Sequence, residues 1–378
     1  MSEVTAMDNY QLRSEILSGG AKYYIQSNLV PNKRAVVTSL FFEGRLLSTR
    51  TEGYDPSLQP DAVRTLVRCI HEERKVRITS LLAIREQLKK GVDPRAHLKL
   101  GQALHQQKLY KEAMAEVIRA IKLGMEHALA YSILGNCLLA TEDCEKALKA
   151  FQKGIEISPD YPDLHNDLGR TYLKLERCRE AVDAFEKALD INKYYQSAFL
   201  NLAVALSLNV VLKQNYDLSR ELHSRMRHLL AMNIQLRPSF DGEGFQTAVK
   251  AVDDERYDVV HRTLAAIQEE QERIALDDLS LELYLIVKFR GDQLTEDEID
   301  RYIGRLQTAL ESNPGYADLQ NDLGILFTAK CKLLIDRANE SFEEALAVNP
   351  KFKKAEKNLK LVSNDRQGIH FLLKALLD

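Results

Sequence analysis

The chain has 378 residues, of which 45% are hydrophobic and 28% charged, and its net charge is −3. This near-neutral balance gives no general attraction to nucleic acid, so we expect no nucleic-acid partner. No apolar run approaches the roughly 20 residues that a membrane-spanning helix needs, so we expect no integral membrane contact. The five cysteines are odd in number and fall mostly in helical patterns, which favours reduced thiols and a cytoplasmic location.

The first 92 residues differ in pattern from the rest. Residues 1–20 are polar, and we expect a flexible N-terminus that ends at Gly19-Gly20. Strand-forming residues at 23–30, 35–42 and 46–51 predict a three-stranded antiparallel β-meander, with no strands elsewhere. A segment without internal Pro or Gly follows at 60–90 and predicts one long helix, or two with a kink. Because a small sheet is marginal alone, we expect residues 21–92 to form one module in which the helix covers the sheet.

A fixed spacing appears beyond this module. Glycines lie 34 residues apart at Gly101, Gly135 and Gly169. Twelve residues after each glycine comes an alanine, and four residues later a larger apolar side chain. A period of this length is typical of stacked repeats. The residues that carry the pattern beside the glycines are Ala113, Ala147, Ala181, Val117, Phe151, Phe185 and Pro159.

Each repeat predicts two amphipathic helices, such as 128–140 and 142–157, because apolar residues recur three and four positions apart. Glycine inside a helix costs roughly 1 kcal/mol relative to alanine. We therefore expect the glycines to allow close approach of the paired helix, with Ala147 or Ala181 facing the missing side chain. One helix pair cannot bury its apolar face alone, so neighbouring pairs must stack.

This pattern of Leu-Gly, Ala, Phe, Ala and Pro resembles the tetratricopeptide repeat, strongly over 94–195 and again at 317–350. The second match starts from DLQNDLGILF at 318–327 and uses Gly324, Phe342 and Pro350. The resemblance implies a mainly α fold, an α-solenoid of stacked helix-turn-helix repeats. We divide the chain into a flexible N-terminus at 1–20, the sheet-and-helix module at 21–92, three regular repeats at 93–195, degenerate helical repeats at 196–316, a repeat at 317–350 and two capping helices at 351–378.

The resemblance also implies a concave groove lined by the first helix of each repeat. Polar residues recur there at related phases, and their mixed charge favours a peptide or helix that carries both signs. Asp167 would repel a terminal carboxylate, which argues against a clamp for a chaperone tail. We expect alanine at Asn166, Arg170 and Asn201 to leave stability unchanged, as is usual for surface positions. The predicted groove residues are Arg95, Lys99, Gln102, Asn136, Asn166, Asp167, Arg170, Lys174 and Asn201.

No catalytic constellation emerges from the sequence, and we expect no catalytic residues, no cofactor and no metal. Phosphate-binding loops of the GxxxxGK type are absent from the sequence. We therefore interpret the chain as a non-enzymatic scaffold or adaptor for protein or peptide partners, with possible self-association through the N-terminal module. Two alternatives stay open, a folding or secretion chaperone that holds a client segment and a regulatory subunit of an enzyme complex.

Overall fold

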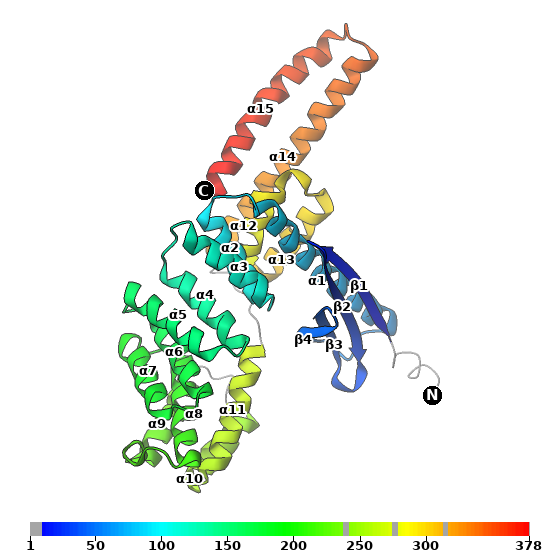
Figure 1. Cartoon of the computed structure of the whole chain (residues 1–378). Coiled ribbons are helices and arrows are strands. Elements are labelled where there is room, and N and C mark those ends of the chain that lie inside the picture. Colours follow the sequence, from blue (N-terminus) through cyan, green and yellow to red (C-terminus); the bar gives the residue numbers. More distant parts are fainter. Residues whose placement is uncertain (1–9, 237–241, 274–278, 313–316, 378) are drawn as a thin grey trace. The chain divides into compact units, whose positions relative to one another are not determined.

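The computed structural model describes residues 10–236, 242–273, 279–312 and 317–377. Clustering by contact divides the chain into two units. One comprises Met1–Arg13, Tyr24–Arg68 and Val92–Leu276, and the other Ser14–Tyr23, Cys69–Gly91 and Asp277–Asp378. The predicted mainly α architecture is confirmed, since helices form nearly all of the described chain after residue 60 (Figure 1).

The N-terminal sheet has four strands in the order β1-β2-β3-β4 rather than the three that we expected. The expectation of a flexible segment at 1–20 is wrong for β1, which spans Gln11–Ser18. Gly19 and Gly20 both have positive φ, which is what a tight hairpin turn of type I′ requires. The other strands are β2 (Ala21–Val30), β3 (Ala35–Phe42) and β4 (Arg45–Gly53).

Helix α1 (Pro60–Leu88) is the single long helix predicted beside the sheet. Arg68 Nε donates to the Tyr10 hydroxyl at 2.9 Å, and Ser14 Oγ lies 2.8 Å from His71 Nε2. These contacts join the start of the first strand to the helix, as expected for a small sheet that needs a covering element. Within the sheet, Ser27 and Thr38 share a buried hydroxyl hydrogen bond of 3.0 Å.

Three helix pairs follow at the predicted period. They are α2 (Pro94–Gln106) with α3 (Tyr110–Lys122), α4 (Ala128–Ala140) with α5 (Cys144–Ile157), and α6 (Pro162–Lys174) with α7 (Cys178–Ile191). Asp93 caps α2 by accepting from the backbone N–H groups of Arg95 and Ala96. In each pair the turn between helices holds a non-glycine residue with positive φ, and these residues are again 34 positions apart: Lys108, Glu142 and Glu176.

The repeat glycines face aromatic or branched side chains, not the alanines that we expected. A Cβ atom placed on Gly135 would lie 2.5 Å from the Phe151 ring, and one on Gly169 would lie 2.6 Å from the Phe185 ring. At Gly101 the neighbour is Val117 Cγ2, at 2.5 Å. Both phenylalanines are fully buried, so each ring occupies the space that the missing side chain leaves. Ala113, Ala147 and Ala181 are also fully buried within the pairs.

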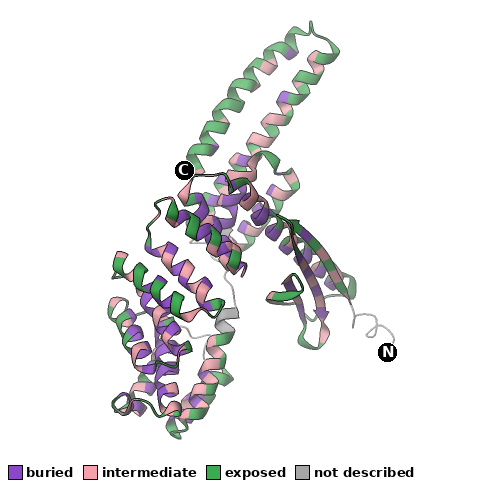
Figure 2. Cartoon of the chain, viewed as in Figure 1, coloured by how far each residue is buried: buried purple, intermediate pink, exposed green. Residues whose placement is uncertain are grey.

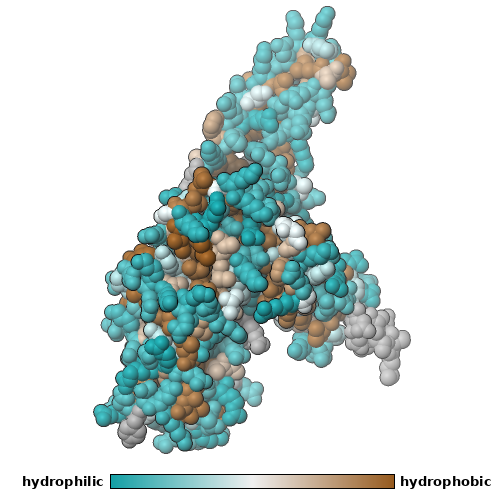
Figure 3. All heavy atoms as spheres, in the orientation of Figure 1, coloured by the Kyte–Doolittle hydropathy of each residue, from teal (hydrophilic) through white to brown (hydrophobic). Residues whose placement is uncertain are grey.

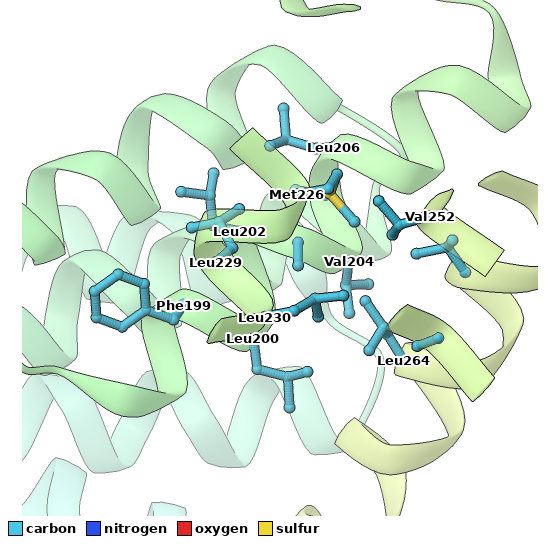
Figure 4. Packing of buried hydrophobic residues seen from close by; sticks show 14 of the residues in the cluster. Phe199, Leu200, Leu202, Val204, Leu206, Met226, Leu229, Leu230, Val252 and Leu264 are labelled. Carbon is cyan, nitrogen blue, oxygen red and sulfur yellow. The ribbon is translucent and has the colours of Figure 1, made fainter. Parts of the chain in front are cut away.

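The next helices build an extended buried cluster. They are α8 (Gln196–Leu212), α9 (Leu222–Leu236), α10 (Glu243–Asp253) and α11 (Tyr257–Arg273). Figure 4 shows Leu200 and Val204 of α8 in one cluster with Met226 of α9 and Leu264 of α11. Helix α11 packs against α8 as well as against its neighbour α10.

Residues after 278 form a second helical group. Helix α12 (Leu279–Arg290) precedes α13 (Glu296–Ser312), which begins with a capping box. Thr295 N donates to Glu298 Oε2 at 3.0 Å, and Glu298 N donates back to Thr295 Oγ1 at 3.2 Å. Arg77 of α1 and Glu282 of α12 form a buried ion pair of 3.0 Å in this unit.

The predicted repeat at 317–350 is wrong, because α14 (Ala317–Val348) is one continuous helix. The phase that holds a left-handed turn residue in the regular repeats falls here on Cys331, which is helical, and no Gly or Pro interrupts residues 325–349. Gly324 meets no atom within 4 Å, Phe342 is half-buried and Pro350 is exposed. The two predicted capping helices are likewise one, α15 (Lys353–Leu377), and Figure 2 shows much of it exposed.

The glycine contacts predict opposite effects of the same substitution at two positions. Gly135→Ala should destabilise the fold by about 1–3 kcal/mol, because the new methyl overlaps the Phe151 ring. Gly324→Ala should be neutral or stabilise by up to about 1 kcal/mol, because it removes glycine from an open helix position. Chemical denaturation monitored by circular dichroism measures both. Equal effects at the two sites would contradict the packing described.

Candidate functional site

The first helices of the repeats place side chains in aligned rows on the inner face of the stack. Residues 34 positions apart occupy the same place on α2, α4, α6 and α8, because each helix repeats the phase of the one before. We name two of these rows by their members. The first row is Lys99, Ile133, Asp167 and Asn201, and the second row is Gln102, Asn136, Arg170 and Val204.

Three of the predicted groove residues bind one another. Asn136 Nδ2 donates to Asp167 Oδ2 at 2.6 Å, and Arg170 Nη1 donates to Asp167 Oδ1 at 3.0 Å. Arg170 Nη1 also lies 3.4 Å from Asn136 Oδ1. Asp167 is buried, so its carboxylate has exchanged water for an amide and a guanidinium. The three side chains therefore tie α4 to α6 across the stack.

Within this cluster the negative charge of Asp167 is balanced by the positive charge of Arg170. Burial raises the pKa of Asp167, while the nearby Arg170 and the hydrogen bond from Asn136 act to lower it. The neighbouring Asp163 accepts a hydrogen bond from the Tyr195 hydroxyl. Both carboxylates of the inner face of α6 thus have donors within the protein. Asp167, which we expected to repel an acidic ligand, is instead partnered by Arg170.

A second pair of predicted residues is buried, contrary to our expectation of exposed groove positions. Asn201 Nδ2 donates to Asn166 Oδ1 at 2.8 Å, and each residue is only 4% exposed. Gln268 Nε2 of α11 donates to Asn201 Oδ1, also at 2.8 Å. Because unpaired buried amides are costly, alanine at these positions should destabilise the fold, which reverses the sequence-based expectation.

Helix α11 explains that burial, because it lies on the inner face of α8. Besides the Gln268 contact, His261 Nδ1 lies 3.4 Å from Ser207 Oγ, and Ser207 occupies the same phase as His105 on α2. Val260 and Leu264 of α11 are fully buried in the cluster that α8 shares. An amphipathic helix of this chain therefore occupies the inner face at the fourth helix pair.

The inner face at α2, α4 and α6 carries the remaining predicted residues. Arg95 and Lys174 are exposed, while Lys99 and Gln102 are half-buried. Lys174 Nζ donates to the Leu139 carbonyl at 3.3 Å, so its charge has a neutral partner. The structure thus brings Asn136, Asp167 and Arg170 together, and leaves Arg95 and Lys174 at exposed positions of the same surface.

His105 and Gln268 lie beside the predicted groove residues. Burial lowers the pKa of His105 to about 4, and Arg170 and Lys108 add to that shift. The repeat period places His105 among the inner-face candidates, since it lies in phase with Leu139 and Leu173. Gln268 lies outside the regular repeats, and no spacing in the sequence points to it.

Other kinds of site were sought in the part of the chain that the structure describes. No group of three His, Cys, Asp or Glu side chains there is arranged to hold a metal ion. Within the same residues, no helix is both long enough and apolar enough to cross a membrane. Burial raises the pKa of the Cys137 thiol to about 12, which keeps it protonated at neutral pH.

The low pKa of His105 predicts a pH dependence of stability. Between about pH 6.5 and 4 the unfolded chain binds a proton at this imidazole and the folded chain does not, so stability should fall as the pH falls through this range. The loss should reach at most about 3 kcal/mol and level off below pH 4. His105→Gln should remove this contribution to the change of unfolding free energy with pH. Denaturation curves of both proteins across the range measure it, and parallel pH profiles would contradict the assignment.

Comparison with known proteins places the helix pairs in a family. Models of the tetratricopeptide repeat match residues 81–126 and 126–193. No curated protein matches the chain.

Solved structures with similar folds include MamA from Desulfovibrio magneticus RS-1, which is 21% identical. That match covers 47% of this chain and 97% of the solved MamA chain, which runs from residue 41 to the end, with a TM-score of 0.36. YrrB, described as a tetratricopeptide repeat protein with an unusual peptide-binding site, is 14% identical over 64% of this chain and 97% of its own, with a TM-score of 0.35. TTC0263 from Thermus thermophilus is 15% identical over 62% and 99%, with a TM-score of 0.33.

The two family models together span α2 to α7, which are the helices that carry the period of 34. These matches, and the stacked helix pairs that they cover, identify residues 81–193 as tetratricopeptide repeats.

Proposed function

We propose that the chain is a non-enzymatic adaptor that binds an acidic segment of a partner protein along the inner face of α2, α4 and α6. The observation that carries the proposal is the position of α11, an amphipathic helix seated on the equivalent face of α8. Recognition of a helix or peptide by such a surface is a common mode of protein binding.

The charge of this surface favours an acidic partner. Asp163 and Asp167 already accept hydrogen bonds from Tyr195, Asn136 and Arg170, so their charges are largely compensated. Arg95 and Lys174 are exposed and positively charged on the same face. A partner segment rich in Asp and Glu would therefore find complementary charge.

Charge reversal tests the proposal. A displayed library of random peptides selected on the full-length chain should yield acidic sequences. Arg95→Glu with Lys174→Glu should weaken their binding by about tenfold, which corresponds to about 1.4 kcal/mol. The matched control is Lys149→Glu with Lys187→Glu, which makes the same change in net charge at exposed positions on α5 and α7. Affinity is measured by fluorescence polarisation.

Three outcomes would contradict the proposal. Selected peptides of neutral or basic sequence would remove the argument from charge. Equal loss of affinity in the control pair would assign the effect to overall charge. Unchanged affinity in the Arg95 and Lys174 variant, with loss on changes in residues 10–92, would move the binding surface to the sheet-and-helix module.

A further inference from the structure

The outward face of α14 carries an apolar seam that the binding surface on the repeats does not use. Its members are spaced alternately three and four residues apart, which is the pattern of a coiled-coil contact. Three of them are large and exposed, Phe327 at 47%, Leu334 at 46% and Val348 at 88%. We call this set the outer seam: Gly324, Phe327, Cys331, Leu334, Ala338, Ser341, Ala345 and Val348.

The side of α14 that faces α15 includes two polar contacts. Arg366 Nε of α15 donates to Asp336 Oδ1 at 2.6 Å, and Ser363 Oγ donates to Asn339 Oδ1 at 3.0 Å. Asp336 lies two positions after Leu334, and two residues of helix turn by about 200°. Asp336 and Asn339 therefore lie toward α15, and the outer seam points away from that helix.

Exposed apolar residues that recur along one helix face mark an interaction surface. Figure 3 shows hydrophobic atoms at the end of the hairpin where α14 meets α15. Val348 and Phe352, which is 44% exposed, lie at that end.

We propose that the outer seam binds the outer seam of a second copy of this chain, with the two α14 helices antiparallel. When the two α14 helices run in opposite directions and cross at residue 336, the side chains of the two seams are complementary in size. Every layer then joins a larger side chain to a smaller one, which is how a coiled-coil core fills without overlap. The layers are Val348 with Gly324, Phe327 with Ala345, Leu334 with Ala338, and Cys331 with Ser341.

The antiparallel register also places charges of opposite sign beside each other along the seam. In the same register, Lys330 of one copy lies beside Glu344 of the other, twice by symmetry. Lys330 already pairs with Asp300 at 2.6 Å and with Glu296 at 3.5 Å, so Glu344 would be the third carboxylate beside this lysine. A parallel pair would instead set Phe327 against Phe327 and glycine against glycine. The open space around Gly324 is then the place that Val348 of the second copy fills.

The oligomeric state of the full-length chain tests the proposal. Sedimentation velocity should find a dimer, and Leu334→Glu should weaken dimerisation by at least about thirtyfold, as for a hot-spot residue. Leu361→Glu is the matched control, because Leu361 is 56% exposed on α15 and lies outside the seam. A monomer at all concentrations, or equal weakening by the control, would overturn the proposal. Neither result bears on peptide binding by the repeats.

Disulfide trapping tests whether the two α14 helices are antiparallel. The two thiols of Cys331 would be about 15 Å apart along the antiparallel pair, so the wild-type chain should not cross-link through them. Ser341→Cys should create a disulfide between Cys331 of one copy and the new cysteine of the other. Cys69→Ser removes the other exposed thiol from the background. A Cys331–Cys331 bond in the wild-type chain would overturn the antiparallel arrangement.

Discussion

Contact between a glycine on one helix and a ring on its neighbour sets the geometry of the repeats. Gly135 and Gly169 leave room for Phe151 and Phe185, and these rings fill the space between paired helices. Close approach fixes the distance within each pair, and the period of 34 then repeats that distance along the stack. The alignment of inner-face side chains depends on this contact, since a shift within one pair would displace its row members.

The sequence predicted the regular repeats well because local and tertiary signals agree there. Helices α2 to α7 follow the period of 34, and a turn residue with positive φ recurs at Lys108, Glu142 and Glu176. At 317–350 the apolar positions match the same family, yet the turn is missing and the chain continues as one helix. Residue identity at packing positions is therefore a weaker guide than the break between helices.

The inner face could be located from the sequence, but the burial and the hydrogen bonds of its residues could not be predicted. The period places Asn136, Asp167 and Arg170 at related phases, and the structure shows that they bind one another. Burial of Asn166 and Asn201 depends on α11, which lies more than fifty residues along the chain and outside the regular period. Contacts of this kind come from tertiary packing, which no local pattern records. The first strand escaped prediction for a related reason, because polar residues interrupt its alternation and Gly19-Gly20 can end a loose segment or turn a hairpin.

The packing of α11 against α8 also limits how long a helical ligand on the inner face could be. Inner helices that pack about 10 Å apart give α2, α4 and α6 a span of about 20 Å between the outer two axes. A helix rises 1.5 Å per residue, so about thirteen residues of helical ligand cross that span. At α8 the surface is already taken by a segment of the same chain. If the inner face binds a helix, α11 therefore limits the length of that helix to the span of α2, α4 and α6.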